Sequence, residues 1–362
     1  SHVIAKTDGA VFSWGATPLS GVEIGSNVPL SRPTYVPALH NLQIVRVAAG
    51  WAHVAFITED GALLTAGEGS FGQLGTGLAT SSGTCSPPAR VGGALEGYAA
   101  TDVAAGLRHT IVSAVANGGP DGGRHHVFAF GSNSKGQLGL PRPPPRRGPA
   151  PATELGEPPG AEPREEALRV AREPKLVGSL SCQQRPIQVA AGGEASALID
   201  ADGRLFLFGR GASPDGRDSH EPKEVDPPAL GADSCRWASV ACGWRHFLAL
   251  DAAGGVWAWG NNSHGQCGLG ERPGPILSPT RIEGLGGSRC VSVASGSEHS
   301  AAVMSDGRLF VWGWGEHGQL GLGDCDDRTA PQPVCLPGPV TQAWCGSGFT
   351  LALCLSSGGG SE

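Results

Sequence analysis

The chain has 362 residues and contains 58 glycines and 29 prolines, yet 40% of its residues are hydrophobic. A disordered chain would be poorer in apolar residues, so the glycines indicate tight turns in a packed protein. The formal net charge is −7, and no run of Lys or Arg is long enough to follow a phosphate backbone. The composition therefore argues against direct nucleic-acid binding.

The ten cysteines show neither a C-x-x-C pair nor a regular spacing. We therefore expect reduced thiols rather than a disulfide framework or a metal site. No stretch approaches the roughly 18 apolar residues that a membrane helix needs, and the first residues do not resemble a signal peptide. These features predict no membrane association and a cytoplasmic location, with the nucleus as a second compartment.

One sequence pattern recurs along the chain. It consists of small residues, a Gly-x-x-His motif, an apolar run, an Asp-Gly pair and a second apolar run that ends in Trp-Gly. The intervals between copies are 50 to 56 residues, apart from one interval of 86. In chain order, the His position falls at His2, His53, His109, Ala195, His246, His299 and Phe349.

The parts of this pattern predict short strands joined by hairpins. An Asp-Gly pair between two apolar runs is typical of a hairpin whose glycine has a positive φ. The alternation in Val256-Trp257-Ala258-Trp259 suits a strand of a sheet that packs between other sheets. The small residues before each Gly-x-x-His motif suit strands crowded around an axis. The Asp-Gly pairs are Asp8-Gly9, Asp60-Gly61, Asp202-Gly203 and Asp306-Gly307.

A second motif, Gly-Gln-Leu-Gly or Gly-Gln-Cys-Gly, follows the Trp-Gly position at 72–75, 136–139, 265–268 and 318–321. Its Gln amide is expected to bind loop backbone groups that would otherwise lack partners. Quasi-identical units of three or four strands predict an all-β protein, with radial sheets around a channel in a β-propeller. The chain begins and ends inside a repeat, so we expect strands from both termini to complete one blade. Counting alone leaves six or seven blades open.

These three motifs resemble the repeats of the regulator-of-chromosome-condensation family over nearly the whole chain. The resemblance implies a closed, seven-bladed β-propeller that forms a single domain over 1–362. The stretches 296–299, 312–318 and 345–354 are similar to secretion-regulating exchange-factor-like propellers and their Elongator-associated relatives. This subgroup resemblance implies a small zinc-containing protein partner that acts in tRNA wobble modification and diphthamide synthesis.

The ultraviolet photoreceptors of the same family resemble this chain at Gly243-Trp244-Arg245-His246. Their stacked array of Trp and Arg needs this tetrad in consecutive blades. Two other copies here read Gly50-Trp51-Ala52-His53 and Gly106-Leu107-Arg108-His109. We therefore expect that stacked array to be absent.

No motif of a hydrolase, zinc protease or phosphate-binding loop occurs, so we predict no catalytic residue, no metal site, no cofactor and no enzyme activity. The repeated histidines are expected to be core residues that bind neighbouring backbone. The acidic run at 324–327 lacks the closing Glu of a calcium loop, and we expect it to be a solvated turn.

Exposed loop residues are the candidates for partner binding, with turn capping as their alternative role. A Trp in a loop is costly to leave in water and is often an interface anchor, which makes Trp314 the strongest candidate. The candidate residues are Trp314, Glu316, His317, Asn262, His264, Trp244 and Arg245.

The interval of 86 residues contains a Pro-rich segment, 141–175, that we expect to form a surface insertion. The sequence as a whole predicts a monomeric, protein-binding propeller scaffold, with the small zinc-containing protein as its implied partner. The alternative is a guanine-nucleotide exchange factor for a small GTPase. Neither hypothesis involves nucleic acid or a membrane.

Overall fold

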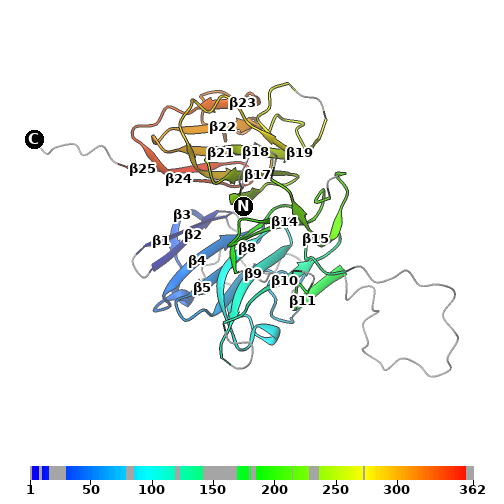
Figure 1. Ribbon diagram of the computed structural model, residues 1–362. Helices are drawn as coiled ribbons and strands as arrows, with labels where there is room; N and C mark the ends of the chain where they lie inside the picture. The colour runs from blue at the N-terminus through cyan, green and yellow to red at the C-terminus, as the bar shows by residue number, and fades with distance from the viewer. Residues whose placement is uncertain are drawn as a thin grey trace, which may run out of the picture.

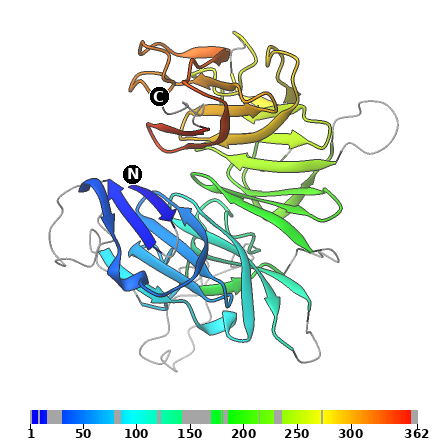
Figure 2. The same ribbon diagram turned by 90° about the vertical axis from the view of Figure 1, so that its left-hand side faces the viewer.

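The computed structural model describes residues 2–7, 10–15, 30–78, 85–118, 123–141, 169–178, 180, 185–213, 215–227, 236–271 and 274–355. In this part of the chain, 25 strands form seven antiparallel sheets, and the two helices are single 3-10 turns. Successive sheets follow one another around a common centre (Figures 1 and 2). We number these sheets as blades 1 to 7 in chain order. The fold is therefore the expected all-β propeller.

The elements of blades 1 to 3 are β1 (His2–Thr7), β2 (Ala10–Gly15), β3 (Leu30–Tyr35), η1 (Pro37–Leu39), β4 (Ile44–Ala49), β5 (His53–Thr58), β6 (Leu63–Glu68), β7 (Cys85–Arg90), η2 (Gly93–Leu95), β8 (Tyr98–Ala105), β9 (His109–Ala116), β10 (His125–Ser132) and β11 (Val170–Leu176). The elements of blades 4 to 7 are β12 (Pro186–Ala191), β13 (Ala195–Asp200), β14 (Leu205–Gly209), β15 (Ser219–Val225), β16 (Trp237–Cys242), β17 (His246–Asp251), β18 (Val256–Gly260), β19 (Ile276–Arg281), β20 (Cys290–Ser295), β21 (His299–Met304), β22 (Leu309–Gly313), β23 (Arg328–Pro333), β24 (Val340–Cys345) and β25 (Thr350–Cys354).

Seven sheets decide the blade number in favour of seven over six. Blades 2 to 6 each have four strands, whereas blade 1 has the three strands β1–β3 and blade 7 has only β24 and β25. The expectation that strands from both termini complete one blade is not met by the described strands. The reason is that β1 and β25 are both the second strand of the repeat, so the two fragments cannot merge into one four-stranded sheet.

The hydrophobic core is divided among the joints between successive blades. Each of six clusters of buried residues is shared by two neighbouring blades, from blades 1 and 2 to blades 6 and 7. Within the described ranges, no seventh cluster joins blade 7 to blade 1, although the two lie on the same side of the molecule (Figures 1 and 2). Stability therefore depends on nearest-neighbour contacts, as in other repeat proteins.

The turn motifs behave as the sequence predicts. Gly61, Gly203 and Gly307 of the Asp-Gly pairs have φ values of 78°, 75° and 82°. The pair Asp8-Gly9 lies outside the described residues. In each Gly-Gln loop, the Gln Oε1 accepts a hydrogen bond of 2.8 or 2.9 Å from the backbone N–H two residues earlier, at Gln73, Gln137, Gln266 and Gln319.

The repeated histidines join one blade to the next. His246 of blade 5 is fully buried, and its Nε2 lies 3.0 Å from Ser300 Oγ of blade 6. Ser300 Oγ in turn donates a 2.8 Å hydrogen bond to the backbone oxygen of Gln266 in blade 5. Because the hydroxyl hydrogen is used by Gln266, the imidazole must donate through Nε2–H. The partner is thus a side-chain hydroxyl and not the backbone group that the sequence analysis predicted.

The same three-membered arrangement recurs at three other joints, and we call it the inter-blade relay. Its His-to-hydroxyl distances are 2.9, 2.9 and 3.1 Å, and its hydroxyl-to-carbonyl distances are 2.8, 2.7 and 2.8 Å. A Cβ at Gly243 would lie 2.1 Å from the His246 ring, which explains the Gly of the Gly-x-x-His motif. The other relays are His53–Thr110–Gln73, His109–Ser196–Gln137 and His299–Thr350–Gln319.

The joint between blades 4 and 5 lacks the relay because both partners are replaced. Ala195 stands at the His position, and Phe247 stands where blades 3, 4, 6 and 7 have a hydroxyl. Phe247 instead stacks on Trp259, with ring centroids 5.4 Å apart. Gln188 adds two hydrogen bonds of 3.0 Å to the backbone of Val240 across this joint. The Trp237 backbone N–H and indole N–H also donate across it, to the backbone oxygens of Gly203 and Val225. This joint is therefore held by apolar packing and by hydrogen bonds that involve no histidine.

The Pro-rich segment 141–175 falls mostly outside the described residues, which stop at 141 and resume at 169. Its last residues belong to β11, which pairs with β10 as the outer strand of blade 3. No helix among the described residues is long and apolar enough to cross a membrane.

The relay makes a testable contribution to stability. Ser300→Ala removes the acceptor of His246 and one of the two donors to Gln266. The imidazole N–H is then buried without a partner, whereas the Gln266 oxygen keeps its 2.9 Å hydrogen bond from the Trp312 indole. We expect the free energy of unfolding, measured in urea, to fall by about 1–3 kcal/mol. The exposed Ser305 offers the control Ser305→Ala, which should change it by less than about 0.5 kcal/mol. Equal effects of the two substitutions would contradict a stabilising role for the relay.

The buried histidines should also make stability depend on pH. Burial lowers the pKa of His246 to about 3, with a smaller effect of the His299 charge, and burial lowers the pKa of His109 and of His299 to about 4. The unfolded chain takes up these protons near pH 6.5, the ordinary value, but the folded protein does not. The contribution of these neutral histidines to the free energy of unfolding is therefore fully present above pH 6.5 and decreases as the pH falls towards 4.

The variant His246→Gln isolates this effect, because the Gln amide can still donate to Ser300 but does not titrate. We expect the loss of unfolding free energy between pH 6 and pH 4 to become smaller by about 1.4 kcal/mol per pH unit. His40→Gln, which changes an exposed histidine, serves as the control. An unchanged pH slope in His246→Gln would show that this histidine is not responsible.

Candidate partner-binding face

Two kinds of loop meet at one end of blades 2, 3, 5 and 6. The Gly-x-x-His loop leads into the second strand, and the Gly-Gln loop follows the third strand. The pairings of His246 with Gly260 and of His299 with Gly313 place the start of the second strand opposite the end of the third. We call this end of the propeller the loop face. All seven predicted site residues lie on it.

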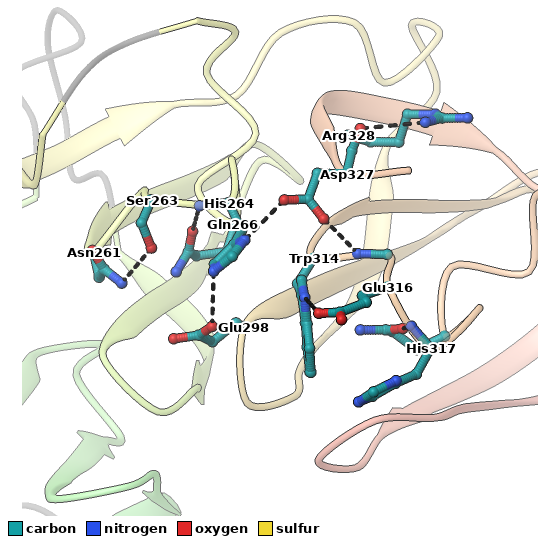
Figure 3. Close-up of polar contacts among 12 residues, drawn as sticks. Asn261, Ser263, His264, Gln266, Glu298, Trp314, Glu316, His317, Asp327 and Arg328 are labelled. Carbon is teal, nitrogen blue, oxygen red and sulfur yellow. Dashed lines mark hydrogen bonds and ion pairs between the residues drawn. The ribbon is translucent and has the colours of Figure 1, made fainter. Parts of the chain in front are cut away.

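Three of those residues form a row of rings at blades 5 and 6 (Figure 3). Trp314 follows β22, and its indole lies between two imidazoles. The ring centroids of Trp314 and His317 are 4.7 Å apart in an edge arrangement, and those of Trp314 and His264 are 6.1 Å apart. The structure therefore brings together residues from two successive Gly-Gln loops.

His264 connects blades 5 and 6 through two carboxylates. Its Nδ1 lies 2.8 Å from Asp327 Oδ2, and its Nε2 lies 3.3 Å from Glu298 Oε2. Asp327 also accepts a 2.8 Å hydrogen bond from the backbone N–H of Gly315. These contacts fix the position of the His264 ring beside Trp314 (Figure 3).

The loop around Trp314 is held by its own hydrogen bonds. The indole Nε1–H donates to Glu316 Oε2 at 3.2 Å, and the His317 backbone N–H donates to Gln319. Trp314 is half-buried, whereas Glu316 and His317 are exposed. The polar edge of the indole is thus satisfied within the chain, and its ring surface and the nearby carboxylate are what a partner can contact.

Asn262 has a different role from the other candidates. Its side chain is buried, and its Oδ1 accepts a 3.0 Å hydrogen bond from the backbone N–H of Cys267. This contact holds the Gly-Gln loop of blade 5, which matches the alternative of turn capping. Asn262 therefore positions His264.

Trp244 and Arg245 lie in the Gly-x-x-His loop of blade 5. The Trp244 ring stacks on Trp51 of blade 2, with centroids 5.8 Å apart and planes inclined by 13°. The Arg245 side chain is exposed, and its backbone oxygen accepts a 2.7 Å hydrogen bond from Asn261. This stacked pair joins blades 2 and 5, which are not consecutive. The sequence analysis did not predict it.

Both tryptophans line a central cavity of about 850 Å³. The small residues before the Gly-x-x-His motifs, such as Ala49, Ala105 and Ala191, also line this cavity, as expected for strands crowded around an axis. The exposed side chains of Trp344, Leu351 and Leu353 from blade 7 line it as well.

The sequence analysis missed Glu298, Asp327 and Trp51. Asp327 lies in the acidic run that was interpreted as a solvated turn, and Glu298 lies inside a Gly-x-x-His motif. Their contacts come from neighbouring blades, so no local pattern marks them. Within the described residues, no group of three or more His, Cys, Asp or Glu side chains could hold a metal ion.

The family follows from comparison with known proteins. A model described as the RCC1-like domain matches residues 1–352. The chain belongs to the RCC1-like domain family. The repeats that resembled this family in the sequence are the blades of the structure.

Relatives of two kinds extend over almost the whole chain. The ultraviolet-B receptor UVR8 of Arabidopsis thaliana is 30% identical over 358 residues, which cover 98% of this chain and 72% of the receptor. The secretion-regulating guanine nucleotide exchange factor of Bos taurus is 29% identical over 386 residues, covering 98% of this chain and 74% of that factor.

Solved structures agree on the fold. Human WBSCR16 superposes with a TM-score of 0.76 at 22% identity, over 98% of this chain and 84% of that one. Prp20p of Saccharomyces cerevisiae, whose structure was described together with its binding to Gsp1p and histones, gives a TM-score of 0.55 at 20% identity, over 96% of this chain and 92% of that one. At these identities the likeness concerns the fold.

Proposed function

We propose that this RCC1-like propeller is a protein-docking platform whose loop face holds a protein partner through the ring row at Trp314. The observation that carries this proposal is the half-buried indole between His264 and His317, with its polar edge already satisfied by Glu316. A fixed aromatic surface of this kind buries a large apolar area at little cost in conformational entropy, as interface anchors do.

The rigidity of the loop face supports the same role. His264 is held by carboxylates of two different segments, and the Gly-Gln loops are closed by their Gln amides. A surface that is ordered before binding loses less entropy when a partner docks. The contacts within the loop face therefore favour a binding surface over catalysis by acid or base groups.

Two classes of partner follow from the family. The subgroup resemblance favours a small zinc-containing protein, for which the propeller would act as an adaptor. The second candidate is a small GTPase, on which the propeller would promote guanine-nucleotide exchange as a protein wedge. The likeness to the secretion-regulating guanine nucleotide exchange factor supports this second function.

The proposal includes a closed ring of seven blades and a monomeric protein in the cytoplasm or nucleus. Blades 1 and 7 lie on the same side of the molecule, which supports closure there (Figure 2). The eight cysteines in the described part of the chain are free thiols, which suits a reducing compartment.

Trp314→Ala tests the platform. Removal of the indole should weaken capture of the partner, by at least about tenfold if Trp314 is an interface anchor, because such residues contribute 2 kcal/mol or more. The measurement is a pull-down with quantitative mass spectrometry, followed by titration of the purified partner, with the zinc-containing protein among those tested. The control Trp344→Ala removes an exposed indole from the central cavity. An unchanged set of partners in Trp314→Ala would argue against this face.

The exchange-factor hypothesis has a separate test. The purified propeller should accelerate release of fluorescent GDP from one member of a panel of small GTPases, and Trp314→Ala should reduce that acceleration if the loop face is used. No acceleration with any member of the panel would rule out nucleotide exchange and leave the adaptor function standing.

A further inference from the structure

The Gly-Gln loops of blades 2 and 6 have the same length and can be compared residue by residue. Blade 2 reads Gly67-Glu68-Gly69-Ser70-Phe71-Gly72-Gln73, and blade 6 reads Gly313-Trp314-Gly315-Glu316-His317-Gly318-Gln319. Both loops contain a hydrogen bond between their second and fourth residues, from Ser70 to Glu68 in one and from Trp314 to Glu316 in the other. Phe71 and His317 are therefore equivalent ring positions.

In blade 2, the next blade places a cation on that ring. The guanidinium carbon of Arg108 lies 4.0 Å from the centroid of Phe71. Arg108 is the residue before His109 in the Gly-x-x-His loop of blade 3. An arginine on an aromatic ring is a stabilising cation–π contact.

In blade 6, the equivalent position of the next blade is Gly348, the residue before Phe349. A Cβ at Gly348 would lie 3.4 Å from His317 Cδ2, so the two positions are adjacent. Gly348 contributes no side chain, and no cation among the described residues lies on the rings of His317 and Trp314 as Arg108 lies on Phe71. The place that an arginine of this chain fills between blades 2 and 3 is therefore open between blades 6 and 7.

The charges around this open place favour a cation. Residue 298 and the stretch 314–328 contain five carboxylates and one arginine. That arginine, Arg328, is already paired with Asp324 at 2.5 Å. Glu316 lies at the edge of the Trp314 ring and is exposed, so its carboxylate can pair with an incoming cation.

We propose that Trp314, Glu316, His317 and Gly348 form a receptor for an arginine side chain of the docked protein partner. The guanidinium would lie on the rings in the place that Gly348 leaves open and would pair with Glu316. Arginine suits this place better than lysine, because its planar group stacks on rings and can bind a carboxylate through two N–H groups. This inference rests on the proposed docking function and specifies the chemistry of the partner.

The receptor can be tested with a defined probe. Protein carrying 15N-labelled tryptophan is titrated with N-acetyl-arginine methylamide, and the indole N–H resonance of Trp314 is followed, after its assignment from its loss in Trp314→Phe. We expect a saturable shift with the arginine probe and none with N-acetyl-glutamine methylamide. The absence of a shift with arginine, or an equal shift with the glutamine probe, would overturn the proposal.

Gly348→Arg provides the decisive variant, because it gives blade 7 the side chain that Arg108 supplies in blade 3. Gly348 does not have a positive φ, so the backbone accepts a side chain there. The new guanidinium should occupy the receptor and abolish the shift caused by the probe. Thr341→Arg adds the same charge to an exposed position of blade 7 and is the matched control. Binding of the probe to a folded Gly348→Arg protein would contradict the proposal.

Glu316→Gln is a second test of the arginine receptor, for use if Gly348→Arg does not fold. The Gln oxygen can still accept from the Trp314 indole, but the negative charge is lost. We expect the affinity for the arginine probe to fall roughly tenfold, as for loss of a charged hydrogen bond. An unchanged affinity would show that Glu316 is not the counter-ion and that the receptor is wrong.

The two proposals can fail separately. If Trp314→Ala loses its partner while Gly348→Arg retains it, the docking platform stands and the arginine receptor is wrong. If the arginine probe binds but Trp314→Ala retains every partner, the arginine receptor is confirmed, and the proposal that partners dock there is wrong.

Discussion

The structure depends on how one blade is attached to the next. At four of the six joints in the described chain, a buried histidine donates to a hydroxyl of the following blade, and that hydroxyl donates back to a Gln carbonyl of the first. A single hydroxyl thus satisfies two buried polar groups of its neighbour, which would otherwise be costly to bury. The relay joins adjacent blades at the loop face, because its residues lie in or directly beside the Gly-x-x-His and Gly-Gln loops. Between blades 5 and 6 it attaches the loop that carries His264 to the start of β21.

Much of this fold is readable from the sequence because each blade repeats the same local rules. Asp-Gly turns, alternating strands and Gly-Gln loops each lie within one repeat of about 50 residues. Their local sequence is enough to predict their local structure. The partner of His246 could not be predicted in this way, since Ser300 lies one blade further along the chain. The expectation that strands from both termini complete one blade was wrong, because β1 and β25 are copies of the same strand and form separate sheets.

The candidate site shows the same division. Trp314, Glu316 and His317 were predicted from one loop, and they do lie together. Asn262 was predicted as a site residue because it lies in a similar loop. Its side chain is buried instead and accepts a hydrogen bond from the backbone N–H of Cys267. Glu298 and Asp327 reach the site from different segments, and Gly348 matters because it lacks a side chain. Features of these kinds become visible only when neighbouring blades are compared in space.

The joint between blades 4 and 5 has a consequence for how the ring comes apart. Ala195 and Phe247 carry no titratable group, and the surrounding cluster contains three tryptophans, Trp237, Trp257 and Trp259. The loss of stability that the relay histidines cause at low pH therefore falls on the four relay joints and not on this one. Blades 4 and 5 should be the last neighbours to separate when acid unfolds the protein.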